Sequence, residues 1–206
     1  MARQKTVRPR RVLLNAGAGP PDDSRLPPFF RGWRQIRVDI DPDLKPDLVA
    51  NIIDLRAIPD GTVDAIWSAH CLEHLFAHQV PMALAEFRRV LRDRGFACII
   101  VPDLQAIGHW IANDQLEETI YHSAAGPVTA HDMLWGFGLA IAAGKVAMAH
   151  HCGFTPAWFL HHLKAAGFPE IVLRRRRSKL ELAALALQRP SADSEHRAKL
   201  LTALGL

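Results

Sequence analysis

The sequence predicts an α/β fold in which helices cover both faces of a seven-stranded, mostly parallel sheet. Short apolar runs alternate with helical patterns along the chain, which is typical of such a sheet. The 206 residues, of which 49% are hydrophobic and 22% charged, suffice for one globular domain with a full core. The apolar runs place the strands at residues 12–16, 35–40, 47–50, 63–68, 95–101, 170–176 and 180–187.

Two segments carry clear helical periodicity, residues 81–93 and 156–166. The second has Thr155 at the N-cap, Pro156 at the first helical position and Gly167 just past the end, which are the residue types that begin and end helices.

The connections between these elements differ in character. Four prolines between Gly19 and Trp33 leave little room for a regular helix, so the first crossover is expected to be a loop or a single turn. The last two strands are close enough in sequence to form an antiparallel hairpin. The chain therefore divides into a basic N-terminal arm at residues 1–11, a single domain at 12–190, and a C-terminal helix or tail at 191–206. Residues 104–150 form an insertion or lid within the domain.

The first strand leads into a turn that contains Gly17 and Gly19, and the second apolar run ends at Asp39. Glycine has no Cβ, so this turn can bend sharply and let a ligand approach the main chain. A carboxylate at the end of the next strand is placed to accept from both hydroxyls of a ribose, and Asp41 is the alternative to Asp39 for this role. The pattern predicts an adenosine-containing cofactor, either a nicotinamide dinucleotide or S-adenosylmethionine.

Five segments in sequence order resemble the class I S-adenosylmethionine-dependent methyltransferases, in particular the small bacterial branch similar to methyltransferase type 11. They are LLNAGAG, VDIDP, DLRAIPDGTVDAIWSAHCLEHL, EFRRVLRDRGFACIIVPD and HHCGFTPAWFLHHLKAAGF, at residues 13–19, 38–42, 54–75, 86–103 and 150–168. The resemblance implies a Rossmann-like, seven-stranded sheet with one antiparallel strand at its edge region, where the last-but-one position is reversed.

The resemblance also implies a site for S-adenosylmethionine, whose product would be S-adenosylhomocysteine. In it Asn15 supports the turn, Asp39 takes the ribose hydroxyls, and Asp54 accepts from the adenine amino group. The backbone N–H of Leu55 donates to the adenine ring, and His70 faces the cofactor from the opposite wall. The implied cofactor-binding set is Asn15, Ala16, Gly17, Gly19, Asp39, Asp54, Leu55 and His70.

The segment from His70 to His74 also spells H-x-x-E-H, a pattern in which one helix supplies two zinc ligands and a glutamate base. Glu117 or Glu118 would be the third protein ligand of such a zinc hydrolase. Residues 63–69, however, have the pattern of a buried strand that ends at the histidine. The same residues fit the methyltransferase pattern S-x-H-x-L-E-H, so no metal is expected.

Two residues are candidates for a catalytic role, His150 and Asp103. His150 precedes the N-cap of the last long helix by five residues, and a loop position there would let it reach a proton of the acceptor. Asp103 follows the fifth strand, and its alternative role is to cap the helix that starts near Leu104. Methyl transfer itself is a direct displacement at a sulfonium carbon, so the protein mainly aligns the reactants and excludes water.

The class of methyl acceptor is narrowed by two motifs that the sequence does not contain. It has no [N/D]-P-P-[Y/F] tetrapeptide, which is common in methyltransferases that act on base or amide nitrogens, and no Pro-Cys pair for cytosine-ring methylation. The expected acceptor is therefore a small molecule, a glycan or a lipid-linked sugar. Nucleic acid is not expected, because aromatic residues are not interleaved with the arginines of 3–11 and 174–177.

Two other function classes follow from the same residues. A short-chain dehydrogenase needs a Tyr-x-x-x-Lys pair, but Ala125 stands four residues after Tyr121. A non-catalytic protein that binds an adenosyl ligand remains the alternative, since Pro20 and Pro21 stand where the resembling family has a third glycine.

The chain reads as a cytoplasmic protein with no membrane span. The apolar run after the basic start ends at Asn15, which is too short for a signal-peptide core or a transmembrane helix. Three widely spaced cysteines argue against a disulfide framework. The net charge of +4 is modest, and the sequence gives no indication of the oligomeric state.

Overall fold

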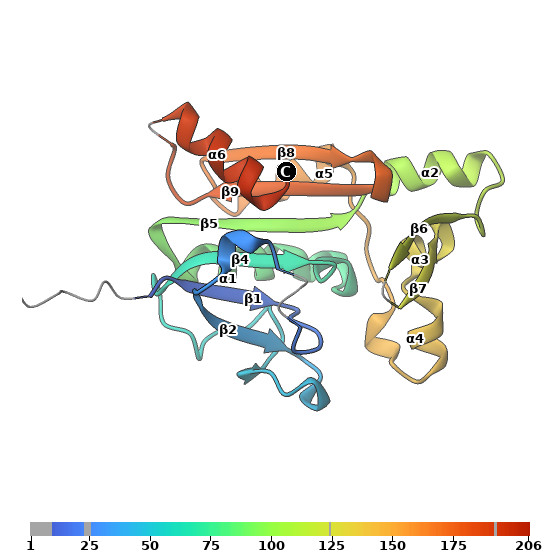
Figure 1. The fold of residues 1–206 in the computed structure, drawn as a ribbon, viewed down its shortest axis with the longest axis horizontal. Coiled ribbons are helices and arrows are strands. Elements are labelled where there is room, and N and C mark those ends of the chain that lie inside the picture. Colours follow the sequence, from blue (N-terminus) through green and yellow to red (C-terminus); the bar gives the residue numbers. More distant parts are fainter. Residues whose placement is uncertain (1–9, 23–25, 124, 192) are drawn as a thin grey trace, which may run out of the picture.

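The computed structural model describes residues 10–22, 26–123, 125–191 and 193–206, and its centre is one seven-stranded sheet (Figure 1). The strands lie in the order β3-β2-β1-β4-β5-β9-β8. β1 to β5 run parallel, whereas β9 is antiparallel to both of its neighbours. The strands are β1 Val12–Ala16, β2 Arg34–Asp39, β3 Leu48–Val49, β4 Val63–Ala69, β5 Leu91–Pro102, β8 Glu170–Arg176 and β9 Glu181–Leu187. The predicted Rossmann-like sheet is confirmed, with the reversed strand one place in from the edge.

Helices cover both faces of this sheet. α1 (Val80–Val90) and α5 (Pro156–Ala165) pack on one face, and α6 (Ser194–Leu204) packs on the other. Because successive side chains of a strand point to opposite faces, Leu14 of β1 belongs to the first core and Leu13 to the second. Both faces of the central strands are thus buried, which explains their nearly continuous apolar sequences.

The first crossover contains only the short 3-10 helix η2 (Pro28–Phe30), as the prolines predict. Its aromatic residues replace the missing helix on the second face. The ring of Phe30 lies 6.1 Å from that of Trp67 and 6.5 Å from that of Phe96, and it meets Trp33 edge-on at 5.3 Å. The chain between β1 and β2 therefore buries apolar area without a regular helix.

The boundary between α1 and β5 differs from the sequence prediction. The helix was expected to continue through residue 93 and the strand to begin at 95, but the strand begins at Leu91. Leu91 pairs with Val63 ahead of a register shift, which brings the polar residues 92–94 into the strand although their side chains are exposed.

The insertion at 104–150 lies beyond the carboxyl ends of the parallel strands (Figure 1). It contains a two-stranded hairpin that the helical periodicity did not predict. Its strands are only partly buried, so they carry little hydrophobic alternation. The elements are α2 Leu104–Ala112, β6 Thr119–Ser123, β7 Gly126–Thr129, α3 Ala130–Trp135, α4 Gly138–Ala142 and η6 Val146–Met148.

Short 3-10 helices complete the fold: η3 Pro42–Leu44, η4 Leu72–His74, η5 Ala77–Gln79 and η7 Arg177–Lys179. Among the described helices, none combines the length and the apolar character that a membrane crossing requires.

Candidate cofactor-binding and active site

The glycine turn after β1 is folded back onto β2 and packed against the segment that follows β4. The N–H groups of Gly17 and Ala18 both donate to the carbonyl of Val38, at 2.9 and 3.0 Å. Gly17 has a φ of +69°, and a Cβ at this position would lie 2.5 Å from Sγ of Cys71. A side chain is therefore excluded both by the backbone conformation and by the neighbouring thiol.

Asp39 at the end of β2 is joined directly to this turn. Its Oδ2 accepts from the N–H of Gly19 at 2.8 Å, and its Oδ1 accepts from the N–H of Asp41 at 3.1 Å. Each carboxylate oxygen can accept a further bond, so the group can still receive two ribose hydroxyls. The carboxylate of Asp41 instead caps η3 by accepting from Asp43. The arrangement therefore favours Asp39 over Asp41.

Arg37 supports the same turn, a role that the sequence did not suggest. Its Nη2 donates to the carbonyl of Gly19 at 2.7 Å, and its Nη1 donates to the carbonyl of Lys45 at 3.0 Å. The guanidinium thus ties the glycine turn to the loop after β2. Charged groups rarely serve two backbone carbonyls unless the geometry is fixed, so Arg37 holds both loops in place.

The backbone of Leu55 is hydrogen-bonded to two side chains of α1. Its N–H donates to Oε2 of Glu86 at 2.6 Å, and its carbonyl accepts from Arg89 at 2.9 Å. The residue is fully buried. The expected donation from the Leu55 N–H to an adenine ring would have to replace its bond to Glu86, and it stays a prediction. Asp54 remains accessible, with its carboxylate paired to Arg56 at 2.7 Å.

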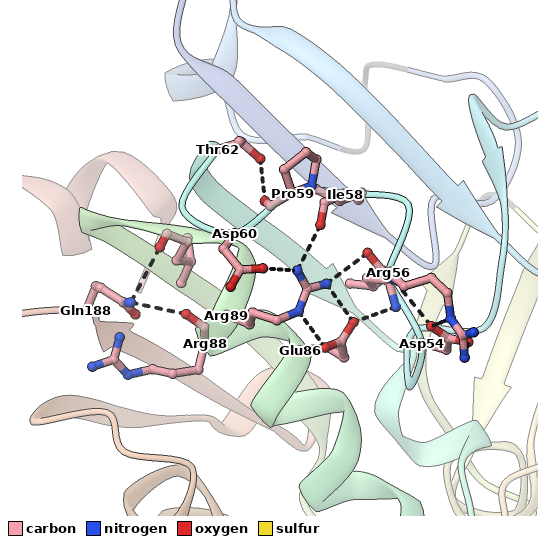
Figure 2. Close-up of polar contacts among 12 residues, drawn as sticks. Asp54, Arg56, Ile58, Pro59, Asp60, Thr62, Glu86, Arg88, Arg89 and Gln188 are labelled. Carbon is pink, nitrogen blue, oxygen red and sulfur yellow. Dashed lines mark hydrogen bonds and ion pairs between the residues drawn. The ribbon is translucent and has the colours of Figure 1, made fainter.

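Figure 2 shows that Glu86 and Arg89 of α1 fix the whole 55–60 loop. Arg89 donates to the carbonyl of Ile58 at 2.9 Å and pairs with Asp60 at 2.6 Å. The bond from Arg89, followed by the N–H of Leu55, lowers the pKa of Glu86 despite partial burial. These contacts join the loop after β3 to the helix behind it.

His70 follows the last residue of β4 and has a left-handed backbone conformation, with a φ of +53°. Its Nε2 lies 2.9 Å from Oε1 of Glu181, and its Nδ1 lies 3.3 Å from Oε1 of Glu73. Burial lowers the pKa of His70, but its contacts with the two glutamates outweigh burial and raise it to about 10. His70 therefore stands at the carboxyl end of β4 as a cation between two buried carboxylates.

The H-x-x-E-H pattern does not form the helix that a zinc hydrolase requires. His70 lies at the strand end, and only Leu72–His74 form a 3-10 helix, η4. Glu118, one expected third ligand, accepts from Gln115 on the exposed side of the insertion. This geometry supports the sequence argument against a zinc-hydrolase helix at residues 70–74.

Cys71 connects the glycine turn with the interior of the site. Burial raises the pKa of its thiol well above the usual value, and the negative charges of Glu73 and Asp39 raise it further. The thiol therefore stays protonated. It lies near both Asp39 and the buried Glu73.

Glu73 is fully buried beside two histidines, His74 and His150. Burial alone would raise the pKa of Glu73, but the neighbouring His70 imidazolium outweighs burial and lowers it. Burial is also the main influence on His150 and lowers its pKa, although the charge of Glu73 opposes the shift. At neutral pH the group therefore contains a carboxylate and a neutral His150.

His150 lines a cavity of about 210 Å³ at the carboxyl end of β5. The insertion supplies one wall through Met133, Leu134 and Trp135, and α2 supplies Leu104 and Ile107 on another. A larger cavity, of about 610 Å³, opens near the amino ends of β1 and β2 and does not touch the glycine turn.

Asp103 has a structural role, as a helix cap and as the partner of an ion pair. It caps α2 by accepting from the N–H groups of Gln105 and Ala106, at 3.1 and 3.2 Å, and its other oxygen pairs with Arg175 at 2.8 Å. It is 1% exposed. These contacts favour its capping role over a catalytic one.

The arginine run near the C-terminal hairpin is also partly structural. Arg175 pairs with Asp103, and Arg176 pairs with Glu181 at 3.1 Å. Both guanidiniums are therefore engaged by carboxylates and are not free to bind a phosphate, as the guanidiniums of a solvated cluster would be. The basic residues of the N-terminal arm, Arg3, Lys5 and Arg8, lie outside the described residues.

The chain was compared with known proteins. Residues 30–99, about a third of the chain, match the family model described as "Methyltransferase domain". No match was found among curated protein sequences.

Solved structures of methyltransferases share the fold. A SAM-dependent methyltransferase from Archaeoglobus fulgidus is 15% identical with a TM-score of 0.56, and the match covers 86% of each chain. The 1,6-didemethyltoxoflavin-N1-methyltransferase of Burkholderia thailandensis, solved with its substrate and S-adenosylhomocysteine, is 18% identical with a TM-score of 0.51 over 88% of this chain and 72% of that one. A putative O-methyltransferase from Nostoc punctiforme is 12% identical with a TM-score of 0.52 over 86% and 52%. The sheet order and the solved structures thus show the fold of SAM-dependent methyltransferases, and residues 30–99 match the methyltransferase domain.

Proposed function

We propose that this protein transfers a methyl group from S-adenosylmethionine to a small-molecule, glycan or lipid-linked acceptor. The observation that carries the proposal is the junction of Gly17, Gly19 and Asp39 at the carboxyl ends of β1 and β2. Ligands of open α/β sheets bind at that edge, beside the point where the strand order reverses, which here lies between β1 and β4.

The surroundings of Asp39 suit an adenosine. Two apolar side chains at the same edge, Ile40 and Val49, are 50% and 54% exposed. Val49 pairs with Asp39 in the sheet register, and Ile40 follows it directly. A flat ring placed beside the ribose would cover exposed apolar area at this position, which supports Asp39 as the ribose-binding residue.

The methionine end of the cofactor would lie along Asn15, Ala16 and Gly17 and would point toward Cys71 and Glu73. The acceptor would occupy the cavity beside His150, on the far side of Glu73 from the glycine turn. Displacement at the sulfonium carbon then requires alignment and exclusion of water, which can contribute about 7–11 kcal/mol. The insertion at 104–150, which forms a wall of that cavity, would exclude the water.

The cofactor half of the proposal is tested by calorimetry with S-adenosylhomocysteine and NAD⁺ in parallel. Micromolar binding of S-adenosylhomocysteine with no binding of NAD⁺ is expected. Binding of NAD⁺ alone would exclude the methyltransferase proposal.

Catalysis needs a second measurement, because a non-catalytic adenosyl-binding protein would also bind S-adenosylhomocysteine. Methyl-labelled S-adenosylmethionine would be incubated with the protein and fractions of small molecules, glycans and glycolipids. Enzyme-dependent transfer of label to one class of fraction identifies the acceptor class. Saturable cofactor binding without transfer to any fraction would favour the non-catalytic alternative.

A further inference from the structure

A carboxylate and two imidazoles converge beside the cavity that His150 lines. Glu73 and His74 belong to η4, whereas His150 arrives from the end of the insertion. One ligand atom from each of the three lies within 4.8 Å of the others. Such a set of two histidines and one carboxylate is typical of transition-metal sites in proteins.

Both imidazoles are oriented for a ligand by backbone carbonyls. Nδ1 of His74 lies 3.1 Å from the carbonyl of Ala149, and Nδ1 of His150 lies 3.0 Å from the carbonyl of Met133. A carbonyl can only accept, so each Nδ1 carries the proton and each Nε2 keeps its lone pair. Histidines that bind metals are commonly held in this way, with one ring N–H donated to a carbonyl.

The surroundings of Glu73 provide an independent indication of a ligand-binding role. The residue has no exposed surface, and neither of its carboxylate oxygens accepts a hydrogen bond from any group in the described part of the chain. Its one charged contact with His70, at 3.3 Å, involves Oε1 and leaves Oε2 without a partner. A buried carboxylate oxygen without a partner is costly, and a cation bound to Oε2 would remove that cost.

We propose that Glu73, His74 and His150 bind one divalent transition-metal ion. Ligand atoms around a tetrahedral Zn²⁺ lie about 3.3–3.5 Å apart, given bond lengths of about 2.0–2.2 Å. The ligand atoms, which lie within 4.8 Å of one another, would therefore need to approach one another by about 1.5 Å at most, which small rotamer adjustments can provide. His70 is not a ligand, because its Nε2 is bonded to Glu181 and the residue lies outside the group of three.

Three protein ligands leave one coordination position open, as in catalytic rather than structural sites. His150 borders the cavity of about 210 Å³, so that position faces the expected place of the acceptor. The metal would bind an oxygen or nitrogen atom of the acceptor and orient it toward the methyl group. This part of the inference rests on the proposed function, whereas metal binding itself does not.

The test uses the full chain after removal of metal with a chelator. Titration with Zn²⁺ by calorimetry and with Co²⁺ by visible absorption is expected to show one equivalent bound with micromolar or tighter affinity. His74→Ala, His150→Ala and Glu73→Gln should each weaken binding at least tenfold. Absence of stoichiometric binding to the unmodified protein would overturn the proposal.

The matched control is His151→Ala, which removes the neighbouring imidazole. His151 stacks on Phe76 with ring centroids 4.5 Å apart and is outside the ligand set. It should bind Zn²⁺ like the unmodified protein, and an equal loss in His151→Ala and His150→Ala would contradict the assignment. Zn²⁺ should also raise the Tm of the unmodified protein but not that of His150→Ala. If Glu73→Gln does not fold, the two histidine variants decide alone.

Binding of S-adenosylhomocysteine to the metal-free protein separates the two proposals. If Zn²⁺ binds and S-adenosylhomocysteine does not, the metal site stands and the methyltransferase proposal fails. If S-adenosylhomocysteine binds and no metal does, the metal site is wrong and the proposed function is unaffected.

Discussion

The N–H of Gly19 donates a 2.8 Å hydrogen bond to the carboxylate of Asp39, twenty residues further along the chain. This bond joins the turn after β1 to the end of β2, so the two elements expected to hold an adenosyl cofactor are already in contact. The carboxylate is thereby oriented before a ribose arrives, and its loss should affect binding more than loss of a nearby acidic residue.

Asp39→Ala is expected to weaken S-adenosylhomocysteine binding by about 1–3 kcal/mol, since paired hydroxyls would lose a charged acceptor. Calorimetry measures the change. The control is Asp41→Ala, which removes only the cap of η3 and should bind almost as the unmodified protein does. A larger loss in Asp41→Ala would move the ribose assignment to that residue.

Arg37→Gln should weaken cofactor binding about tenfold, because the carbonyls of Gly19 and Lys45 lose their shared donor and the turn loosens. Arg34→Gln, an exposed change on the same strand, is the control and should leave the affinity unaltered. Equal affinities for both variants would show that the turn keeps its shape without the guanidinium.

Gly17→Ala should reduce the free energy of unfolding by about 1–3 kcal/mol more than Gly61→Ala, because of the overlap with Cys71. Both glycines have positive φ, +69° and +62°, but a Cβ at Gly61 meets nothing within 4 Å. Urea unfolding measures the difference. Adding Cys71→Gly to Gly17→Ala should restore part of the loss, since it removes the Sγ and Cβ that the new methyl would meet. No restoration would assign the cost to the backbone alone.

Glu86→Gln should lower the free energy of unfolding by about 1.5–3 kcal/mol at pH 7, because charged hydrogen bonds to Arg89 and Leu55 are lost. The exposed pair of Asp93 with Arg189 provides the control, and Asp93→Asn should have little effect.

The pKa of Glu86 is lowered in the folded state, so its contribution is present above the ordinary carboxyl pKa and lost as the pH falls below it. The difference between the unmodified protein and Glu86→Gln should therefore shrink as the pH decreases from 7 through about 4. A difference that stays constant over this range would show that the charge is not responsible.

The strands were predicted because local apolar runs determine them, and β1 and β8 were placed at their observed bounds. The reversed strand in the last-but-one position followed from the family resemblance. The sequence did not predict the β6–β7 hairpin, since partly buried strands carry weak alternation. The start of β5 was also missed, because polar residues there join the ladder through pairing with β4 rather than through their own pattern.

The sequence likewise predicted some parts of the candidate site and missed others. Gly17, Gly19 and Asp39 lie at strand ends, where the order of elements alone brings them together. The contact between Leu55 and Glu86 spans 31 residues and depends on how α1 packs, which no local motif records. The meeting of His74 with His150 depends on the path of the whole insertion, so the sequence singled out each histidine without pairing them.

The position of β9 has a consequence for how the chain acquires its structure. Residues 181–187 occupy the sixth place of the sheet and pair with the longest strand, β5, along seven positions from Phe96 to Pro102. During synthesis, that apolar edge stays open until β9 has emerged, although every other neighbour of β5 is already present. A chain interrupted before residue 181 would expose an unpaired strand edge, a template for aggregation, and would leave His70 without Glu181.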